Sequence, residues 1–476
     1  MARVESNSLP TMNREHQIVR VFRGQFQGGN PARFCRESLP EGDFRRILIK
    51  PNWVRHQEDD TFPIEALVTS PLLIEEVIES CLSKYPSAEE ITIGDVPLQN
   101  CQFDLLLRQS GTDRLVNKYA TLARPRVQFL DLRAERFRSS NGFYAKDAGG
   151  IYGDPKGYRE VVLDTDSFLE PISGAKEKFR VADYSPEETI SSHGPGCHRY
   201  LICGSALDSD LFINLPKMKT HQKAGVTGAL KNLVGINGQK ANLVHYRHGM
   251  ARQSGDEFPN DISLLVWLQS RIRQRLQKRS KVLFRLLQPG WSALKAIGGV
   301  QTKGTRENLR KNFYLSGGAW YGNDTVWRMI YDLNRIIRYA PAEGGKLKTT
   351  PQRAYVAIMD GMIAGEGNGP LQPLPVNPGV LLAGRDPFAI DIVMARLMGF
   401  DHNSIPQLKH HLRFGDADWG SSKADELPIE DMGRLLMGIK NLPVIGQFLA
   451  PPGWVGHIEM REGKHADKRV QSADLF

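Results

Sequence analysis

Residues 211–221 have the sequence LFINLPKMKTH, in which an apolar run, Leu211–Leu215, is followed by Pro216 and then by basic and polar residues. The run is short, continuous and aliphatic, which favours a strand that is buried on both faces. Four other runs have the same form, and each ends in a polar or glycine-rich turn. They are residues 47–49, 91–93, 355–359 and 380–383.

Helical patterns alternate with these runs, over residues 72–84, 325–339 and 388–398. Each pattern follows a residue type that commonly caps a helix N-terminus. The predicted caps are Ser70, Asp324 and Asp386. The alternation predicts an α/β fold with a mostly parallel sheet covered by helices on both faces, arranged as one sheet or as two lobes.

The net charge of +9, from 62 Lys and Arg against 53 Asp and Glu, is concentrated in one segment. Residues 271–311 contain twelve basic residues and one acidic residue, and apolar residues recur nearby at helical spacing. We therefore expect a basic α-helical insertion at 249–318. The other predicted parts are an N-terminal extension with the first strand region (1–42), the two parts of the α/β body (43–248 and 319–462) and a polar tail (463–476).

Three interpretations fit the insertion. The simplest is an amphipathic helix that packs on its own body and exposes a basic face. Apolar residues beside the cations, such as Phe284 and Trp291, favour instead the binding of an anionic membrane surface through residues 271–311. Nucleic acid binding is the third and least favoured interpretation.

Composition narrows the class of protein. The 476 residues are 41% hydrophobic and 24% charged, which excludes a mainly disordered, collagen-like or coiled-coil chain. The five cysteines form no C-x-x-C pair, which disfavours a disulfide framework, a zinc ribbon and a ferredoxin-type cluster. Neither a signal peptide nor a transmembrane run is recognised. We expect a cytoplasmic protein, located at the inner face of a membrane under the membrane interpretation.

Charged and polar side chains follow the predicted strands. In open α/β sheets, ligands bind at the carboxyl ends of the strands. Lys50, Asn52, Asp95 and Asp386 all stand at such ends, together with the basic group after Pro216. This mixture of charges suits a small polar molecule, although solvent exposure alone also produces polar strand ends.

The densest group of candidate residues begins directly after the strand 211–215. Lys219 and His221 lie in it, and a turn rich in glycine and threonine leads on to a predicted helix. Free N–H groups at a helix N-terminus favour anions, so we expect a bound carboxylate or phosphate. The expected ligands of that anion are Lys217, Thr227, Lys231 and Asn232. His221 is the expected general acid or base, with a neighbouring lysine lowering its pKa. The residue order differs from a Walker A motif, which disfavours an ATPase.

Asp360 and Glu366 lie in a glycine-rich segment, 360–370, that we predict to be a loop. These carboxylates could exchange protons or help to bind a hydrated cation. The alternative is a tight surface turn. His245 and His248 could share a helix face and bind zinc, but no further ligand is evident, and no metal site is predicted.

Several blocks of this sequence resemble signatures of the domain-of-unknown-function 362 (DUF362) family. They are Lys50-Pro51-Asn52, Asn214-Leu215-Pro216-Lys217-x-Lys219-Thr220-His221, Thr227-Gly228-Ala229-x-Lys231-Asn232-x-x-Gly235, Asp360-Gly361…Glu366-Gly367-x-Gly369-Pro370 and Ala383-Gly384-x-Asp386-Pro387-x-Ala389-x-Asp391. The resemblance covers residues 43–250 and 350–402. It implies no general activity, and this chain lacks the cysteine spacing of the members that carry iron–sulfur clusters.

The Lys-x-Lys-Thr-His segment is also similar to the corresponding segment of lactate-racemase-type proteins. Those proteins epimerise 2-hydroxy acids with a nickel-pincer cofactor held by Lys and His. The similarity implies a role in the site for Lys217, Lys219, His221 and Lys231. The sequence itself assigns no cofactor.

The leading hypothesis is an enzyme that binds a small anionic metabolite at the strand ends and transfers a proton or isomerises the bound molecule. His221 would move the proton, with Lys219, Asp360 and Glu366 as the other catalytic candidates. The first alternative is a non-catalytic protein that binds a membrane or another polyanion through the insertion. The second alternative is a redox protein related to the iron–sulfur members of the family.

Overall fold

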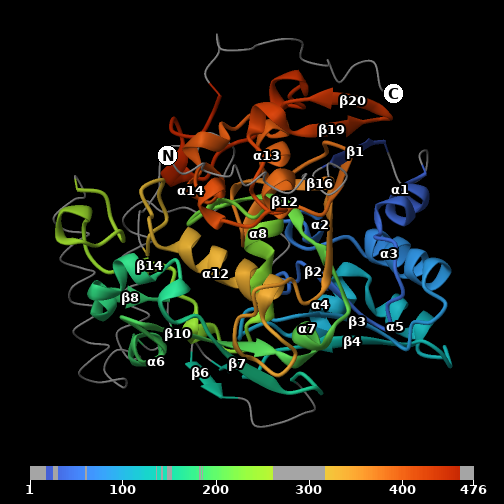
Figure 1. Cartoon of the computed structure of the whole chain (residues 1–476), viewed down its shortest axis with the longest axis horizontal. Coiled ribbons are helices and arrows are strands. Elements are labelled where there is room, and N and C mark those ends of the chain that lie inside the picture. The colour runs from blue at the N-terminus through green and yellow to red at the C-terminus, as the bar shows by residue number, and fades with distance from the viewer. Residues whose placement is uncertain are drawn as a thin grey trace, which may run out of the picture.

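The structure is a computed structural model (Figure 1). It describes residues 18–24, 30–58, 62–135, 137–140, 143–146, 153–181, 184, 186–260 and 317–460. Most of the predicted basic insertion, residues 261–316, lies outside the described residues, and so does the predicted polar tail.

One large sheet forms the centre of the molecule. Its strands are β1 (Val19–Arg23), β2 (Arg46–Pro51), β3 (Glu90–Asp95), β4 (Arg126–Asp131), β11 (Leu211–Leu215), β12 (Lys217–His221), β13 (Gly225–Val226), β16 (Ala354–Asn368), β17 (Gln372–Val376), β18 (Val380–Gly384), β19 (Pro428–Asp431) and β20 (Arg434–Met437). Their order is β20-β19-β1-β18-β16-β11-β2-β3-β4, with β12 and β17 also pairing β16, and β13 pairing β12. The central strands β16, β11, β2, β3 and β4 are parallel. The predicted apolar runs are β2, β3, β11, β16 and β18, which confirms the α/β class with a mostly parallel sheet.

Helices cover both faces of this sheet (Figure 1). They include α1 (Pro31–Ser38), α2 (Ile64–Leu67), α3 (Pro71–Lys84), α4 (Phe103–Ser110), α5 (Asp113–Tyr119), α6 (Pro186–Ser192), α7 (Gly204–Asp208), α8 (Gly228–Asn232), α12 (Val326–Tyr339), α13 (Pro387–Leu397) and α14 (Pro406–Lys409). Alternate residues of β2 face opposite sides, as the strand period requires. Ile47 and Ile49 pack in one cluster with α3, whereas Leu48 packs in another with α12 and α13. Each fully buried side chain of this kind contributes roughly 1.5–3 kcal/mol.

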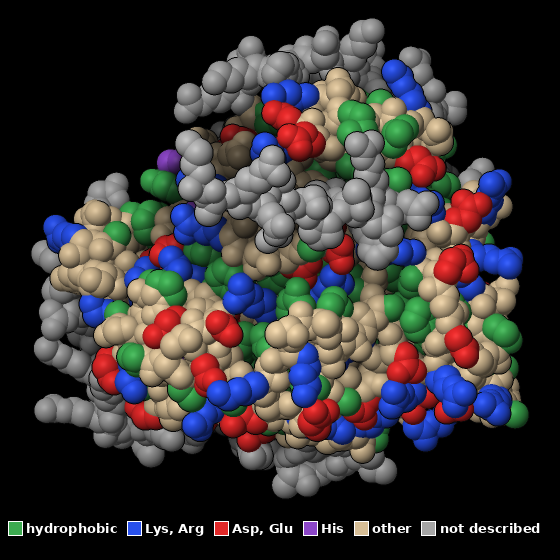
Figure 2. All heavy atoms as spheres, viewed as in Figure 1, with side chains coloured by type: hydrophobic (Ala, Val, Ile, Leu, Met, Phe, Trp, Pro, Cys, Tyr) green, Lys and Arg blue, Asp and Glu red, His purple; other side chains and the backbone are tan. Residues whose placement is uncertain are grey.

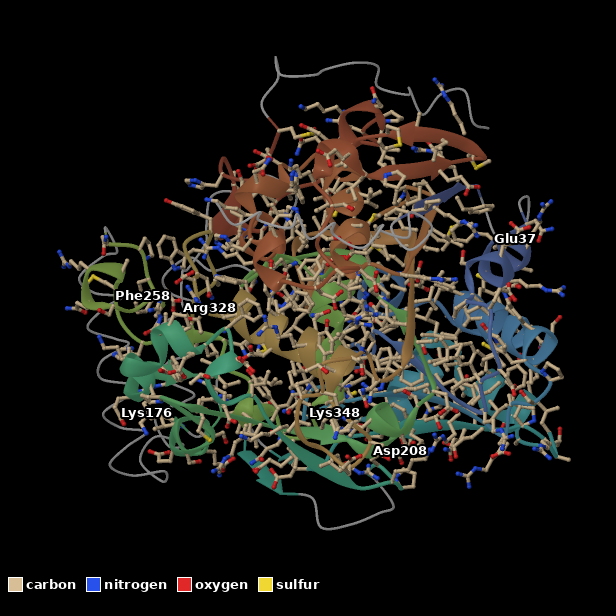
Figure 3. The ribbon with its side chains drawn as sticks, in the orientation of Figure 1. Glu37, Lys176, Asp208, Phe258, Arg328 and Lys348 are labelled. Atoms are coloured by element: carbon tan, nitrogen blue, oxygen red, sulfur yellow. The ribbon has the colours of Figure 1, made fainter. Side chains whose placement is uncertain are left out.

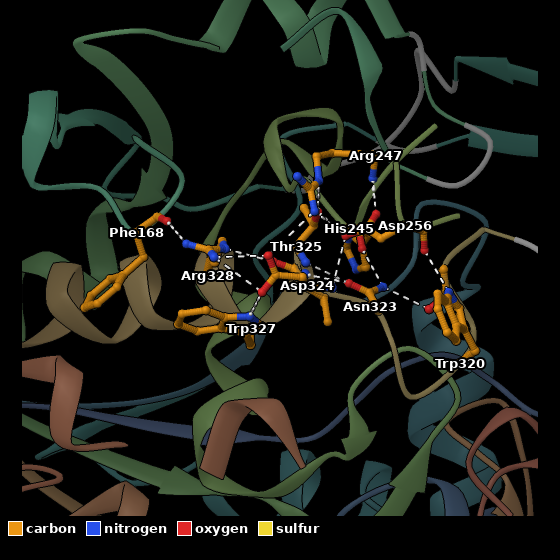
Figure 4. Close-up of polar contacts among 12 residues, drawn as sticks. Phe168, His245, Arg247, Asp256, Trp320, Asn323, Asp324, Thr325, Trp327 and Arg328 are labelled. Atoms are coloured by element: carbon orange, nitrogen blue, oxygen red, sulfur yellow. Dashed lines mark hydrogen bonds and ion pairs between the residues drawn. The ribbon is translucent and has the colours of Figure 1, made fainter. Parts of the chain in front are cut away.

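Two of the three predicted helix caps are confirmed. Ser70 and Asp386 accept N–H groups in the first turns of α3 and α13, at 3.2 and 2.9 Å. The third prediction was wrong. Asn323 Oδ1 accepts two N–H groups at the start of α12, each at 3.0 Å (Figure 4), while Asp324 pairs with Arg328 at 3.1 Å. Adjacent Asn and Asp have similar capping propensity, so their order in the sequence could not separate them.

The segment that we predicted to be a loop and the basic group after Pro216 both belong to strands. The basic group after Pro216 forms β12, and residues 360–368 form the second half of the 15-residue strand β16. Glycine allows β12 and β16 to approach closely, because a Cβ at Gly365 would lie 3.0 Å from the Cβ of Lys219. The prediction failed because glycines that usually mark a turn serve strand packing here. The alternative of a tight surface turn is wrong for the same reason.

Three smaller sheets complete the described part. Their strands are β15 (Gly345–Lys346), β7 (Tyr158–Val162), β10 (Cys197–Cys203) and β9 (His193–Gly194); β14 (Tyr246–Arg247) and β8 (Phe179–Arg180); and β5 (Phe137–Ser140) and β6 (Phe143–Lys146). In Figure 1, β7, β8, β10 and β14 lie below and to the left of the large sheet, with α12 between them and α13. None of the helices in the described ranges is long and apolar enough to cross a membrane.

The charged surface of this view is mixed. Figure 2 shows Lys and Arg side chains alternating with Asp and Glu along the lower edge of the molecule. Asp208 and Lys348, labelled in Figure 3, lie in that lower region. The described surface in this view therefore presents no large area of a single charge.

Candidate functional site

A buried ion pair joins the ends of the neighbouring strands β2 and β3. Lys50 Nζ lies 2.8 Å from Asp95 Oδ1, and the two side chains are only 1% and 5% exposed. The backbone N–H of Trp53 donates to the other carboxylate oxygen at 2.7 Å. Gly235 packs directly on the pair, because a Cβ at that position would overlap Asp95 Oδ1. Burial lowers the pKa of Lys50, and the nearby carboxylate opposes that effect.

Three asparagine side chains extend from this pair. Lys50 Nζ and Asn52 Nδ2 donate to Asn232 Oδ1 at 3.3 and 2.8 Å. Asn232 Nδ2 in turn donates to Asn214 Oδ1 at 2.7 Å. Asn52 Oδ1 is buried and has no hydrogen-bond partner among the described residues. An unsatisfied buried acceptor costs about 1–3 kcal/mol, so a bound donor would stabilise the site here.

A second buried ion pair joins β12 to β16. Lys217 Nζ lies 2.8 Å from Asp360 Oδ2, and both side chains are almost completely inaccessible to solvent. The strand register places these two residues side by side. The same carboxylate oxygen accepts the backbone N–H of Ser70 at 2.7 Å. Asp360 is therefore held by a cation and a helix start, in the middle of a strand and not in the predicted loop.

Three further lysines are buried without a carboxylate partner in the described part of the chain. Lys219 Nζ donates to the carbonyl of Leu67 at 2.6 Å, and Lys240 Nζ donates to the carbonyl of Val234 at 3.3 Å. Lys231 is 6% exposed and makes no hydrogen bond or ion pair with the described residues. We call Lys219, Lys231 and Lys240 the lysine site.

Burial lowers the pKa of every member of the lysine site. It lowers the pKa of Lys231 to about 7 and that of Lys240 to about 8. The pKa of Lys219 falls well below its ordinary value, through burial and then through the charges of Lys217, Lys231 and Lys50. Lys50 Nζ bonds the side chain of Asn232, the residue next to Lys231, and α8 packs against β12, which carries Lys217 and Lys219. The two ion pairs and the lysine site therefore lie in one cationic region. An anion bound there would favour the charged lysines.

Two histidines lie in the same electrostatic environment. After burial, Lys231 is the largest influence that lowers the pKa of both His221 and His245 well below 6.5, so both rings are neutral at pH 7. His221 Nδ1 accepts the backbone N–H of Lys223 at 3.1 Å, which assigns its proton to Nε2. His245 Nδ1 donates to the carbonyl of Leu243 at 2.6 Å, so its Nε2 keeps a lone pair. The region thus contains one imidazole donor and one imidazole acceptor.

The interpretation of His245 and His248 as two residues on one helix face was wrong. They flank the short strand β14, which pairs with β8. His248 Nδ1 lies 2.5 Å from Glu257 Oε2, while Asn323 Nδ2 donates to the backbone carbonyl of His245 at 3.0 Å (Figure 4). In the part of the chain that the structure describes, no group of three or more His, Cys, Asp or Glu side chains is placed to hold a metal ion.

Three other predicted site residues have different surroundings. Thr227 is buried next to Lys219, whose carbonyl accepts the Thr227 N–H at 2.8 Å, and Thr227 Oγ1 has no partner among the described residues. Glu366 Oε2 accepts the N–H of Leu449 at 2.8 Å, which ties it to the C-terminal part of the chain. Asp386 caps α13, and burial raises its pKa to about 7.

The N-terminus of α8 does bind a carboxyl group, but that group belongs to the protein. Asp391 Oδ1 accepts the N–H of Ala229 at 2.6 Å, and Oδ2 accepts that of Leu230 at 3.0 Å. Burial raises the pKa of Asp391 to about 8. The expectation that these N–H groups receive a ligand was therefore wrong, because a carboxyl group from α13 already occupies the helix start.

The structure thus brings some of the predicted residues together. Lys50, Asn52, Asp95 and Asn232 form one network, and Lys217 and Asp360 form a separate buried pair. Glu366 and Asp386 bond to other parts of the chain. The sequence analysis missed Lys240 and the roles of His245 and Asp391. His245 stood in a recognisable His-x-x-His pair, and Asp391 ended a quoted block, but no pattern in the sequence pointed to Lys240.

The fold and the site define an α/β protein with a buried cationic region built on β2, β12 and α8. The family model for the domain of unknown function DUF362 matches residues 158–396, half of the chain, so this chain belongs to that family. The family resemblance expected from the sequence is confirmed. The family description names no activity.

Similarity to individual proteins is shorter or more distant than the family match. A thylakoid-associated protein of Synechocystis sp. is 38% identical over 60 residues, which are 13% of this chain and 19% of that protein. A solved protein structure from Thermotoga maritima shares 10% identity, covering 73% of this chain and 53% of that one, with a TM-score of 0.32. The lactate racemase apoprotein from Thermoanaerobacterium thermosaccharolyticum shares 13% identity, covering 82% and 59%, with a TM-score of 0.30. This chain therefore spans less than two thirds of each of these proteins.

Proposed function

We propose that this protein is an enzyme that binds a small carboxylate- or phosphate-bearing molecule at the lysine site and transfers a proton on it. One observation carries the proposal. Lys219, Lys231 and Lys240 are buried, and none has a carboxylate partner in the described part of the chain. Buried ammonium groups are normally paired, so this arrangement fits an anionic guest.

The energetics favour a charged ligand. Removing an ammonium group from water costs several kcal/mol when no counterion replaces the water. The lysines lower this cost by losing protons, as the depressed pKa values of Lys231 and Lys240 show. A carboxylate or phosphate would favour their protonated forms, so binding would take up protons. The unsatisfied hydroxyl of Thr227 would donate a hydrogen bond to an oxygen of the same molecule, and Asn52 Oδ1 would accept one from a donor group on it.

The two neutral histidines suit proton transfer. His221 Nε2–H can donate to an oxygen of the ligand, while the lone pair on His245 Nε2 can accept a proton from carbon or oxygen. Lys231 would stabilise the negative charge that develops when a proton leaves a carbon next to a carboxylate. The reaction class that we propose is therefore proton abstraction or isomerisation on a small anion.

Ligand binding is tested by thermal unfolding. Inorganic phosphate should raise the melting temperature of the wild-type protein above that in chloride of equal ionic strength. The variant K231M should lose most of this rise, and K346M, which changes an exposed lysine paired with Asp164, should keep it. An equal phosphate effect in K231M and wild type would contradict binding at the lysine site.

Proton transfer is tested by isotope exchange. In D2O, the protein should exchange a carbon-bound proton of at least one member of a panel of small 2-hydroxy and 2-oxo acids, observed by NMR. H221Q should slow that exchange by about 10²–10⁴-fold, the range for loss of a general acid–base group. Undiminished exchange in H221Q would remove His221 from the mechanism.

We also propose that residues 271–311 bind an anionic membrane surface. The support is their charge, twelve basic residues against one acidic, beside apolar residues such as Trp291. The similarity to a thylakoid-associated protein of Synechocystis agrees with this proposal. The protein should float with vesicles that contain anionic lipid at low salt, and not with neutral vesicles. No flotation with anionic vesicles would contradict this second role.

A further inference from the structure

We propose that Lys231 forms an imine with the carbonyl carbon of a small 2-oxo acid. This inference rests on the proposed function, because the carboxylate of the 2-oxo acid would be the anion bound at the lysine site. It adds a covalent step and a substrate class: a carbonyl group directly attached to a carboxylate.

Comparison of the lysines in this region singles out Lys231. Lys50 and Lys217 are each paired with a buried carboxylate. Lys219 and Lys240 donate to backbone carbonyl oxygens. The half-buried Lys223 also donates to a backbone carbonyl, that of Gly317, at 2.7 Å. Among the described residues, Lys231 alone in this group has no such partner. Its amine is therefore buried and available, without an internal bond to break before it reacts.

The surroundings of Lys231 keep its amine nucleophilic. The charges that act on it come from the cations Lys240 and Lys223, and no carboxylate is among the causes of its shifted pKa. Burial together with neighbouring positive charge favours the neutral amine, and only the neutral amine attacks a carbonyl carbon. Lysines that form imines in enzymes are activated in this way.

The neighbouring cations can hold the carboxylate of the same molecule. Lys219 lies on β12, against which the helix of Lys231 packs, and among the described residues its amine bonds the carbonyl of Leu67 and no carboxylate. Thr227 lies beside Lys219, because its N–H donates to the carbonyl of Lys219. The hydroxyl oxygen of Thr227 is buried and has no hydrogen-bond partner among the described residues. A 2-oxo acid has its carboxylate and carbonyl on adjacent carbons. One molecule could therefore contact Lys219 and react with Lys231.

The covalent step needs no group from outside the protein and the substrate. The lone pair of Lys231 Nζ forms a bond to the carbonyl carbon, and the π electrons of C=O move to oxygen. His245 Nε2 accepts one proton from the nitrogen and passes it to the oxygen, to which His221 Nε2–H donates a hydrogen bond, and this gives a carbinolamine. The second proton of the nitrogen then moves by the same route to the hydroxyl, which leaves as water while the nitrogen lone pair forms the C=N bond. The reaction joins one amine and one carbonyl and releases one water.

Reductive trapping tests this inference on the full-length protein. Pyruvate, the probe, is added with sodium cyanoborohydride, which donates hydride to an imine carbon and fixes it as a secondary amine. Intact-protein mass spectrometry counts the adducts, and peptide mapping places them. We expect one adduct per chain, on Lys231, formed on the order of tenfold or more faster than on an exposed lysine such as Lys346, because more of the buried amine is neutral.

Two variants test whether the adduct forms on Lys231. K231R keeps the charge and removes the primary amine, so it should abolish the fast adduct, while K346M should retain it. Inorganic phosphate should slow labelling of the wild-type protein by competing for the lysine site. Fast labelling of K231R, or labelling spread evenly over exposed lysines, would overturn the inference.

The two proposals fail in different ways. If phosphate stabilises the wild-type protein but not K231M, and pyruvate leaves no adduct on Lys231, the imine is wrong and the anion site remains. If phosphate gives no Lys231-dependent stabilisation and no adduct forms, both proposals are wrong. Circular dichroism of each variant establishes that it is folded before either result is read.

Discussion

The carboxylate of Asp391 packs against Gly228 so closely that a Cβ on the glycine would overlap it. Asp391 also accepts the N–H groups of Ala229 and Leu230, and so it fixes the start of the helix that carries Lys231. A residue on α13 thereby positions a residue of the lysine site. Gly228 has a φ of +63°, a conformation that other residues rarely adopt.

The first prediction concerns this cap. D391N should lower the free energy of unfolding by about 1–3 kcal/mol, because an amide cannot accept both N–H groups and one buried donor is left unsatisfied. The measurement is urea unfolding. D401N is a matched control, since Asp401 accepts the N–H of Asn403 at 3.0 Å but is partly exposed, and it should cost much less. Equal losses in the two variants would contradict the role of Asp391.

The second prediction concerns the buried pair Lys50–Asp95. K50M should destabilise the protein by about 3–5 kcal/mol, because it leaves a carboxylate buried without its cation. D95N should also destabilise it, since it removes the counterion of a buried lysine. The double variant K50M/D95N should lose less than the sum of the single losses, as urea unfolding can show. Additive losses would mean that the two side chains do not stabilise each other.

The third prediction is a pH dependence of the ligand-free protein. Folded Lys231 and Lys240 lose their protons near pH 7 and 8, whereas the unfolded chain keeps them to the ordinary pKa of 10.5. Between these values the unfolded state binds more protons, so the free energy of unfolding should rise with pH, by up to about 1.4 kcal/mol per pH unit for each lysine. Urea unfolding at pH 7, 8 and 9 without phosphate measures the slope. K231M should flatten it and K346M should not; an unchanged slope in K231M contradicts the assignment.

The fourth prediction is proton uptake when an anion binds. Phosphate should favour the protonated lysines, so binding at pH 8 should draw protons from the buffer. Calorimetry in two buffers with different ionisation enthalpies measures the number taken up. Affinity should fall as pH rises above about 8, where Lys240 also loses its proton. In K231M the uptake should decrease, and equal heats in both buffers for the wild-type protein would show that the lysines do not change protonation.

The sequence predicted the strands β2, β3, β11, β16 and β18 and the helices α3, α12 and α13, because continuous apolar runs and caps such as Ser70 are local signals. It also selected Lys50, Lys217 and Lys231, which follow the predicted ends of strands or turns, but it did not select Lys240. It could not predict which lysines are paired. That depends on register, which sets Lys217 beside Asp360 across 143 residues of chain. The glycines of β16 misled the prediction, because close strand packing and tight turns require the same residue type.

The length of β16 has a consequence for how this protein can change. One uninterrupted strand supplies buried side chains such as Val356 and Ile358 and, further along, the counterion of Lys217. Side chains alternate between the two faces of a strand, so insertion of a single residue after Ile358 would turn the carboxylate away from its lysine. Homologous chains should therefore tolerate length changes in the loops around this strand. Between Ile358 and Asp360 they should tolerate only insertions or deletions of an even number of residues, which preserve the two-residue repeat.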